Sequence, residues 1–180
     1  ANFSIGQYSS KYDTYQQGEE LPNVFNNDFE GGSLYDMGVY PLYVAVDLFG
    51  KPLTATLKEI TDAKGIDLYE HYFLDYADFY VTIFVSKAVH SLNQSEIYLD
   101  DEVVRISDIT NIDRVEVHQK DGGRVSEIAY PVRNWMDDEV AVFADILQNP
   151  GEVQTEKYQA LTQLSRQVLE VMETLKGERS

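Results

Sequence analysis

The stretch that says most about the fold of this 180-residue chain is a glycine pair followed by a mixed run, Gly31-Gly32-Ser33-Leu34-Tyr35-Asp36-Met37-Gly38-Val39-Tyr40-Pro41-Leu42. Side chains four residues apart project from the same face of a helix. If a helix starts near Ser33, Asp36 can therefore orient or polarise the hydroxyl of Tyr40. We interpret this pair as a candidate proton-transfer site.

The apolar pattern continues from Leu34 to Phe49 on most sides of the chain, which predicts a helix buried between layers. Gly50 and Pro52 end it. Pro41 removes one backbone hydrogen bond, so it predicts a kink or a shifted helix start. Ahead of the glycines, an alternating segment at 2–8 predicts a strand, and a loop should follow it.

Beyond the helix the hydrophobic period becomes two. Strand-like segments lie at 53–61, 66–76, 78–89, 91–99, 102–106, 113–119 and 124–130. The links between them are short, which favours antiparallel neighbours, because parallel strands need long crossovers. We therefore predict the α+β class, with an open, mostly antiparallel sheet and helices packed on one face.

Two of these strands mix aromatic and small polar residues on the face away from the core, a composition enriched at protein interfaces. The aromatic residues are Tyr69, Phe73, Tyr80 and Phe84, and the same face of the first strand carries Asp67. A partly wet sheet with scattered aromatics is the alternative. We favour a subunit interface, and hence a homodimer or higher homo-oligomer.

Two amphipathic helices close the chain, and both are expected to pack on the sheet. Their apolar stripes are Val140, Phe143, Ala144 and Leu147, then Leu161, Leu164, Val168, Met172 and Leu175. The acidic run at 137–139 lies where a first helical turn would be. Interaction with the helix dipole explains it without a metal.

Composition limits the function further. The net charge of −17 argues against nucleic-acid or anionic-membrane partners, because phosphates are bound by clustered Lys and Arg. The chain has no Cys, and no leader or long apolar run is visible, which suits a cytoplasmic protein. Its three His residues are scattered without ligand spacing, so no metal is expected.

The glycine-pair motif, together with Leu48-Phe49-Gly50-Lys51-Pro52, resembles the substrate domain of the glucose–fructose oxidoreductase, inositol dehydrogenase and MocA (Gfo/Idh/MocA) family of NAD(P)-dependent oxidoreductases. The segment 95–101 looks like a later strand of that family. Many members have His at the position of Tyr40. Dihydrodiol dehydrogenases and glucose–fructose oxidoreductases have Tyr there, so this chain resembles that group. The resemblance covers most of the chain.

The resemblance implies hydride transfer between nicotinamide and a sugar, polyol or dihydrodiol-like substrate, with Tyr40 moving the hydroxyl proton and Asp36 holding the reacting groups. Asn23 and Asn26 occupy the segment where many relatives have Trp-Arg-x-Asp, so they are candidate substrate contacts. A phenol with a pKa near ~10 is a poor base at neutral pH and needs a neighbouring cation. The family supplies one as the Lys of a Glu-Lys-Pro motif.

That motif and a Gly-x-Gly-x-x-Gly turn are both missing from the sequence. We therefore interpret 1–180 as a single C-terminal substrate-binding and dimerisation domain, inactive alone, with NAD or NADP bound mainly by an absent N-terminal domain. Two alternatives stay open. The first is a non-catalytic member used for ligand sensing or protein contact, and the second is a binding module unrelated to redox chemistry.

Overall fold

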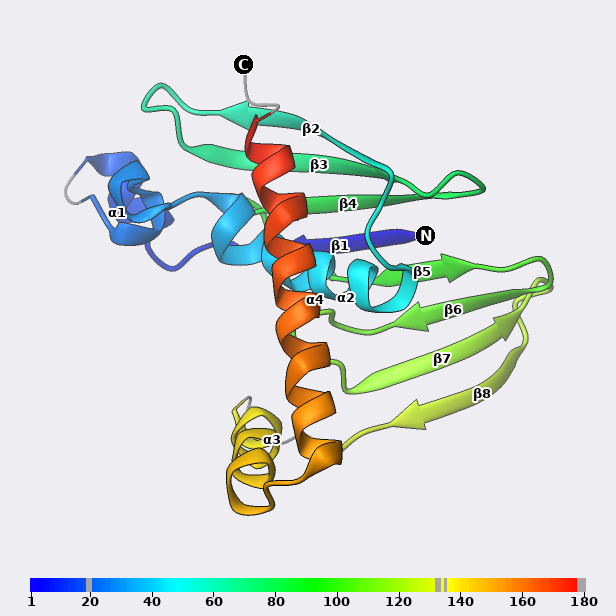
Figure 1. The fold of residues 1–180 in the computed structure, drawn as a ribbon. Coiled ribbons are helices and arrows are strands. Elements are labelled where there is room, and N and C mark those ends of the chain that lie inside the picture. The colour runs from blue at the N-terminus through cyan, green and yellow to red at the C-terminus, as the bar shows by residue number, and fades with distance from the viewer. Residues whose placement is uncertain (19–20, 132–133, 135, 178–180) are drawn as a thin grey trace.

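The structure is a computed structural model that describes residues 1–18, 21–131, 134 and 136–177. Its centre is one eight-stranded sheet with the strand order β2-β3-β4-β1-β5-β6-β7-β8 (Figure 1). The strands are β1 Asn2–Gly6, β2 Thr54–Thr61, β3 Asp67–Asp75, β4 Tyr80–Ser86, β5 Ser95–Tyr98, β6 Glu102–Ile106, β7 Arg114–Gln119 and β8 Arg124–Ala129. The predicted α+β class and open, mostly antiparallel sheet are confirmed.

One neighbouring pair in this sheet, β1 with β4, is parallel. These strands are far apart in the sequence, and the intervening chain supplies the long crossover that parallel pairing requires. The pair lies at the middle of the sheet, where β1 also pairs antiparallel with β5. The carboxyl ends of β1 and β4 consequently lie side by side at the same end of the sheet.

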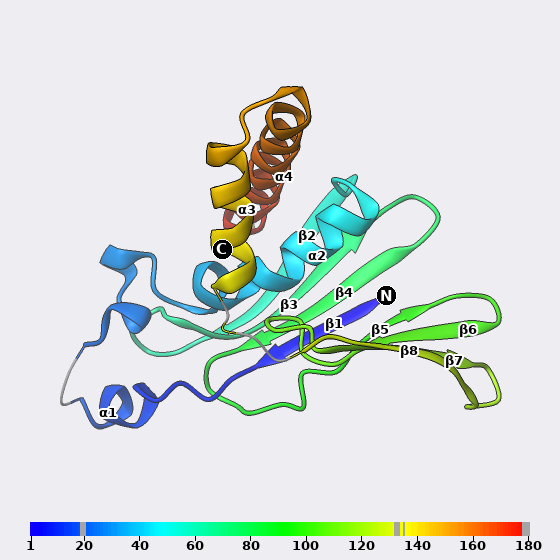
Figure 2. The same ribbon diagram turned by 90° about the horizontal axis from the view of Figure 1, so that it is seen from below.

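The helical elements divide between the connection after β1 and the end of the chain. They are α1 Tyr12–Gln17, the short 3₁₀ turns η1 Asn23–Phe25 and η2 Asn27–Phe29, the π-helix η3 Leu34–Gly38, α2 Val39–Phe49, α3 Asp137–Gln148 and α4 Glu152–Gly177. The first three lie in the predicted loop. Figure 2 shows that α2 and α4 lie on the same side of the sheet.

The helix predicted from Leu34 to Phe49 therefore begins as a wider π turn and becomes an α-helix at Val39. Pro41 lies in the first turn of α2, where a missing N–H is tolerated. Single π turns inside helices often occur at functional sites. This one contains Asp36.

The main core lies between β1–β4 and the pair α2 and α4. Its fully buried side chains include Phe3, Leu34, Leu42, Tyr72, Leu74, Val81, Ile83, Val85 and Leu175. A second, smaller core of Tyr15, Phe25, Ile66, Leu68 and Ala88 lies under α1 and the 3₁₀ turns.

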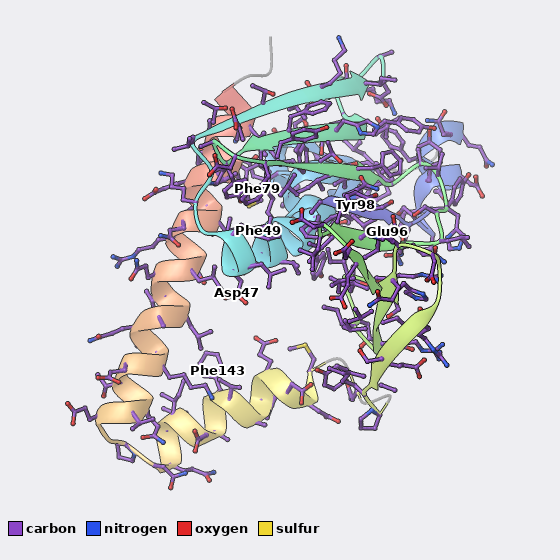
Figure 3. All side chains as sticks on the ribbon, turned by 90° about the vertical axis from the view of Figure 1, so that its right-hand side faces the viewer. Asp47, Phe49, Phe79, Glu96, Tyr98 and Phe143 are labelled. Atoms are coloured by element: carbon purple, nitrogen blue, oxygen red, sulfur yellow. The ribbon has the colours of Figure 1, made fainter. Side chains whose placement is uncertain are left out.

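The position predicted for α3 is wrong, because this helix does not pack on the sheet. Val140, Phe143 and Leu147 are 61%, 58% and 75% exposed, and α3 has no buried residue. Figure 3 shows Phe143 on the side of α3 that faces α2, whose end carries Asp47 and Phe49. The stripe is amphipathic as predicted, but amphipathicity does not specify the partner of a helix.

The opposite face of the sheet carries the aromatic residues that the alternation assigned to it. Phe73 and Tyr80 are 47% and 66% exposed, whereas their sequence neighbours Tyr72 and Val81 are fully buried. Among the described residues no helix has the length and apolar character that a membrane crossing requires.

Candidate functional site

A hollow of about 200 Å³ opens where the carboxyl ends of β1 and β4 meet the start of the η3–α2 helix. Its lining residues are Ile5, Gln7, Ser9, Ser10, Asp36, Met37, Tyr40 and Lys87. Asp36 and Tyr40, the predicted pair, lie at the same hollow.

Parallel pairing brings the residues that follow β1 and β4 together. The amide of Gln7 donates to the carbonyl of Ser86 at 3.0 Å, and the amide of Ser9 donates to the carbonyl of Lys87 at 2.9 Å. These bonds extend the ladder beyond the strands, so the hollow has a wall of ordered backbone.

The glycine pair and its serine are explained by Asp67, which begins β3. The amides of Ser33 and Leu34 donate to Asp67 Oδ2 at 2.6 and 3.0 Å, and the Ser33 hydroxyl donates to the Asp67 carbonyl at 3.0 Å. Gly32 has φ +119°, and a Cβ there would overlap the Asp67 carboxylate. The carboxylate thus satisfies the first N–H groups of the helix, as an N-cap does.

Asp67 was predicted on the face of its strand away from the core, and that prediction is wrong, because the residue is 1% exposed and its carboxylate accepts from the amides at the start of the η3 helix. The pairing of β2 with β3 shifts register between Ile60 and Thr61, opposite the start of β3. Bulges increase the local twist and re-aim side chains. Strict alternation therefore fails at this end of the strand.

Gly38 allows the helix to approach β3 closely. A Cβ at Gly38 would overlap the hydroxyl of Tyr72, which donates to the buried carboxylate of Glu70. This contact seats the η3–α2 junction against the sheet. Asp36 and Tyr40 lie on the outer side of the junction, with the Asp36 side chain 47% exposed and Tyr40 46% exposed.

Lys87 is the site residue that the sequence analysis missed. Its side chain is only 2% exposed, and Nζ lies 2.8 Å from Asp36 Oδ2. Nζ also donates to the carbonyl of Val24 at 2.7 Å and lies 4.9 Å from the ring centroid of Phe25. A signal was present, because the core-facing alternation of β4 extends two residues beyond Val85 to this lysine.

The two candidate asparagines differ in position. Asn23 lines a second hollow of about 250 Å³ that it shares with Asp36 and Tyr35. Asn26 caps η2, because its Oδ1 accepts from the amide of Asp28 at 3.0 Å. The structure thus brings Asn23 near Asp36 and gives Asn26 a local structural role.

The start of the η3 helix does not offer free donors for a phosphate group. The amides of Gly31 and Gly32 donate to the carbonyls of Asn26 and Val24, and those of Ser33 and Leu34 donate to Asp67. In the described part of the chain no cluster of three or more His, Asp or Glu side chains could hold a metal ion. The side chains that line the hollow can donate hydrogen bonds to a hydroxyl-bearing ligand and accept hydrogen bonds from it.

Sequence comparison finds relatives among curated oxidoreductases, whereas no protein-family model matches the chain. It is 37% identical over 128 residues to scyllo-inositol 2-dehydrogenase (NADP(+)) IolU of Bacillus subtilis strain 168, covering 71% of this chain and 38% of that protein. It is 43% identical over 95 residues to the oxidoreductase YgjR of Escherichia coli K12, covering 53% and 29%. The matched segments thus cover well under half the length of these relatives.

Solved structures share the fold at low sequence identity. KijD10, a 3-ketoreductase from Actinomadura kijaniata in complex with NADP and TDP-benzene, matches with a TM-score of 0.71 and 14% identity, covering 99% of this chain and 52% of that one. UDP-N-acetylglucosamine 3-dehydrogenase GnnA from Acidithiobacillus ferrooxidans matches with a TM-score of 0.62 and 10% identity, covering 99% and 53%. The chain therefore belongs to the Gfo/Idh/MocA family of oxidoreductases and has the fold of the family's C-terminal domain.

Proposed function

We propose that this chain is the C-terminal half of a two-domain NAD(P)-dependent oxidoreductase whose substrate is a sugar, polyol or dihydrodiol-like compound. One observation carries the proposal: Asp36, Tyr40 and the buried Lys87 line a single polar hollow. The names of IolU, an NADP(+) inositol dehydrogenase, and of KijD10, a 3-ketoreductase with NADP, agree with this substrate class.

Tyr40 is the acid and base in this proposal. When bound, the nicotinamide takes or gives the hydride. In oxidation the half-exposed Tyr40, in its ionised form, accepts the proton of the substrate hydroxyl and becomes a neutral phenol, and in reduction the neutral phenol returns that proton. Lys87 holds Oδ2 of Asp36, so Oδ1 is the atom that accepts a hydrogen bond from the substrate or from Tyr40.

The remaining lining groups recognise other hydroxyls. Ser9, Ser10 and Gln7 present hydroxyl and amide groups that both donate and accept hydrogen bonds. A polyol pairs with such groups without bringing a net charge into the hollow. The nucleotide part of the cofactor is bound by the other domain, because the helix start here is already capped by Asp67.

The test uses the longer protein together with the chain itself. Tyr40→Phe in the longer protein should lower kcat/KM by about 10²–10⁴-fold, the usual contribution of a proton-transferring side chain. Tyr43→Phe is the matched control, because Tyr43 lies on the same helix and donates to Ser165 outside the hollow. An unchanged rate in Tyr40→Phe would refute the assigned role.

The isolated chain gives an independent test of the domain assignment. Calorimetric titration with NADH and NADPH should show no binding at micromolar concentration, because the nucleotide site belongs to the other domain. Tight binding by residues 1–180 alone would overturn the two-domain proposal.

We also propose that two copies associate through the open sheet face that bears Tyr69, Phe73, Tyr80 and Phe84. Phe73 is about half exposed and Tyr80 about two-thirds exposed, and burying aromatic surface gains roughly 25 cal/mol per Å². The acidic residues must stay at the rim of this contact, because the chain carries a net charge of −17.

A further inference from the structure

We infer that Lys87 is a positioning residue of the site: it fixes the Asp36 carboxylate and offsets its charge, so that Asp36 and an ionised Tyr40 can share one hollow. The inference rests on the proposed role of Tyr40. It places a cation for the phenol inside this chain, whereas the family resemblance implies one in another domain.

The geometry shows that Lys87 is a fixed charge. An ammonium group has three N–H donors. One of them points to Asp36 Oδ2 at 2.8 Å, and another is donated to the Val24 carbonyl at 2.7 Å. Nζ also lies over the face of the Phe25 ring, 4.9 Å from the ring centroid. A side chain that is 2% exposed and held in this way has little freedom to reorient.

The second core holds this cation in place. Phe25 stacks on Tyr15 with 4.6 Å between ring centroids and 17° between planes, and Tyr15 in turn carries Lys64 Nζ 4.2 Å from its centroid. Phe25 and Tyr15 are buried, so the ring under Lys87 cannot move without disturbing this core. The α1 segment therefore supports the site although it contributes no acid or base.

Charge decides what Lys87 does for Tyr40. Asp36 alone would disfavour a phenolate in the same hollow, because like charges close together oppose ionisation. Lys87 neutralises Asp36 at 2.8 Å, which removes that opposition. Among the residues that line the hollow, the titratable groups are Asp36 from η3, Tyr40 from α2 and Lys87 after β4, whereas the segment after β1 contributes Gln7, Ser9 and Ser10.

Removing Lys87 should therefore affect Tyr40 in a way that a merely structural lysine would not. We propose to follow the ionisation of Tyr40 in the 180-residue chain by NMR with ¹³Cζ-labelled tyrosine, assigning the signal with Tyr40→Phe. Lys87→Met should raise the titration midpoint of Tyr40, because it leaves the Asp36 carboxylate without its cation in the hollow that the two residues share. Lys157→Met, on the exposed surface of α4, removes the same charge elsewhere and should leave the midpoint unchanged.

Two further variants separate positioning from simple loss of charge. The double variant Asp36→Asn/Lys87→Met removes a neutral pair and should return the midpoint close to the wild-type value. Asp36→Asn alone keeps the cation and removes the anion, so it should lower the midpoint. If Lys87→Met does not fold, Asp36→Asn still tests the inference.

An unmoved Tyr40 midpoint in a folded Lys87→Met chain overturns the inference, as does an unmoved or raised midpoint in Asp36→Asn. In the longer protein, the pH at which kcat for oxidation rises should move upward by the same amount in Lys87→Met. An inactive wild-type enzyme would refute the proposed function and leave the NMR result standing. An active wild-type enzyme whose Lys87→Met variant keeps the original pH profile would refute only the inference.

Discussion

The half of the sheet made of β1–β4 and the half made of β5–β8 differ in what covers them. Leu74, Val81 and Ile83 are fully buried under α2 and α4. Among the described side chains of β7 and β8, Glu116 alone is buried. Ile128, on the helix-facing side of β8, is 55% exposed. The candidate site lies in the covered half, where packing holds its residues in place.

The open faces of the two halves differ as well. Over β3 and β4 this face is aromatic, with Phe73 and Tyr80 exposed. Over β6–β8 it is charged, because Glu116 pairs with Arg105 at 3.5 Å and with Arg124 at 3.3 Å. The open face of the sheet thus has an aromatic region that is suited to a protein interface and a charged region that is suited to solvent exposure.

The largest expected effect compares the covered and the uncovered halves of the sheet. Leu74→Ala should lower the free energy of unfolding by about 2–5 kcal/mol, because it leaves a cavity under well-packed helices. Ile128→Ala should cost less than about 1 kcal/mol, because that side chain is already half in water. Equilibrium urea unfolding measures both, and comparable losses would show that the β5–β8 half is covered in solution.

The second prediction compares the two open faces. Tyr80→Lys combined with Phe84→Lys should convert a dimer into a folded monomer in light scattering, because it places charges in the proposed apolar contact. Glu127→Lys, at the charged end of the face and paired with Arg124, is the matched control and should leave the dimer intact. A wild-type chain that is monomeric at high concentration and salt would exclude this interface.

The smallest expected effect depends on pH and concerns Tyr76, which ties the end of α2 to the β3–β4 turn. Its hydroxyl donates to the Gly50 carbonyl at 3.0 Å, its ring stacks on Phe79 at 4.9 Å, and burial raises the pKa of Tyr76 to about 12. The folded state therefore favours the neutral phenol. The resulting stability is complete below the unfolded pKa of about 10 and is lost as pH rises toward 12.

Between pH 9 and 11 the wild type should consequently lose roughly 1 kcal/mol more unfolding free energy than Tyr76→Phe, after allowance for solvent screening. Urea unfolding at both pH values gives the difference. Tyr158→Phe, exposed on α4, should follow the wild type. Identical pH dependence in the wild type and Tyr76→Phe would contradict the assigned cause.

Prediction from the sequence succeeded where a local pattern and a single buried face coincide. The alternation in β3 and β4 separated Tyr72 and Val81 from Phe73 and Tyr80 correctly. It failed for Asp67, where a register shift intervenes, and for α3, whose apolar stripe does not pack on the sheet and has no fully buried residue. Lys87 was missed because a single charged residue at a core-facing position does not indicate a function until its ion-pair partner is known.

The sequence by itself determined the class of the fold, the strands, the end of α2 at Phe49 and the nearness of Asp36 to Tyr40, because these follow from periodicity and spacing along a short stretch of chain. Only the tertiary structure decided that Asp67 caps the helix 34 residues before it and that Lys87 neutralises Asp36. Such contacts join residues far apart in the chain. They depend on strand order and on the parallel pairing of β1 with β4, which no local pattern encodes.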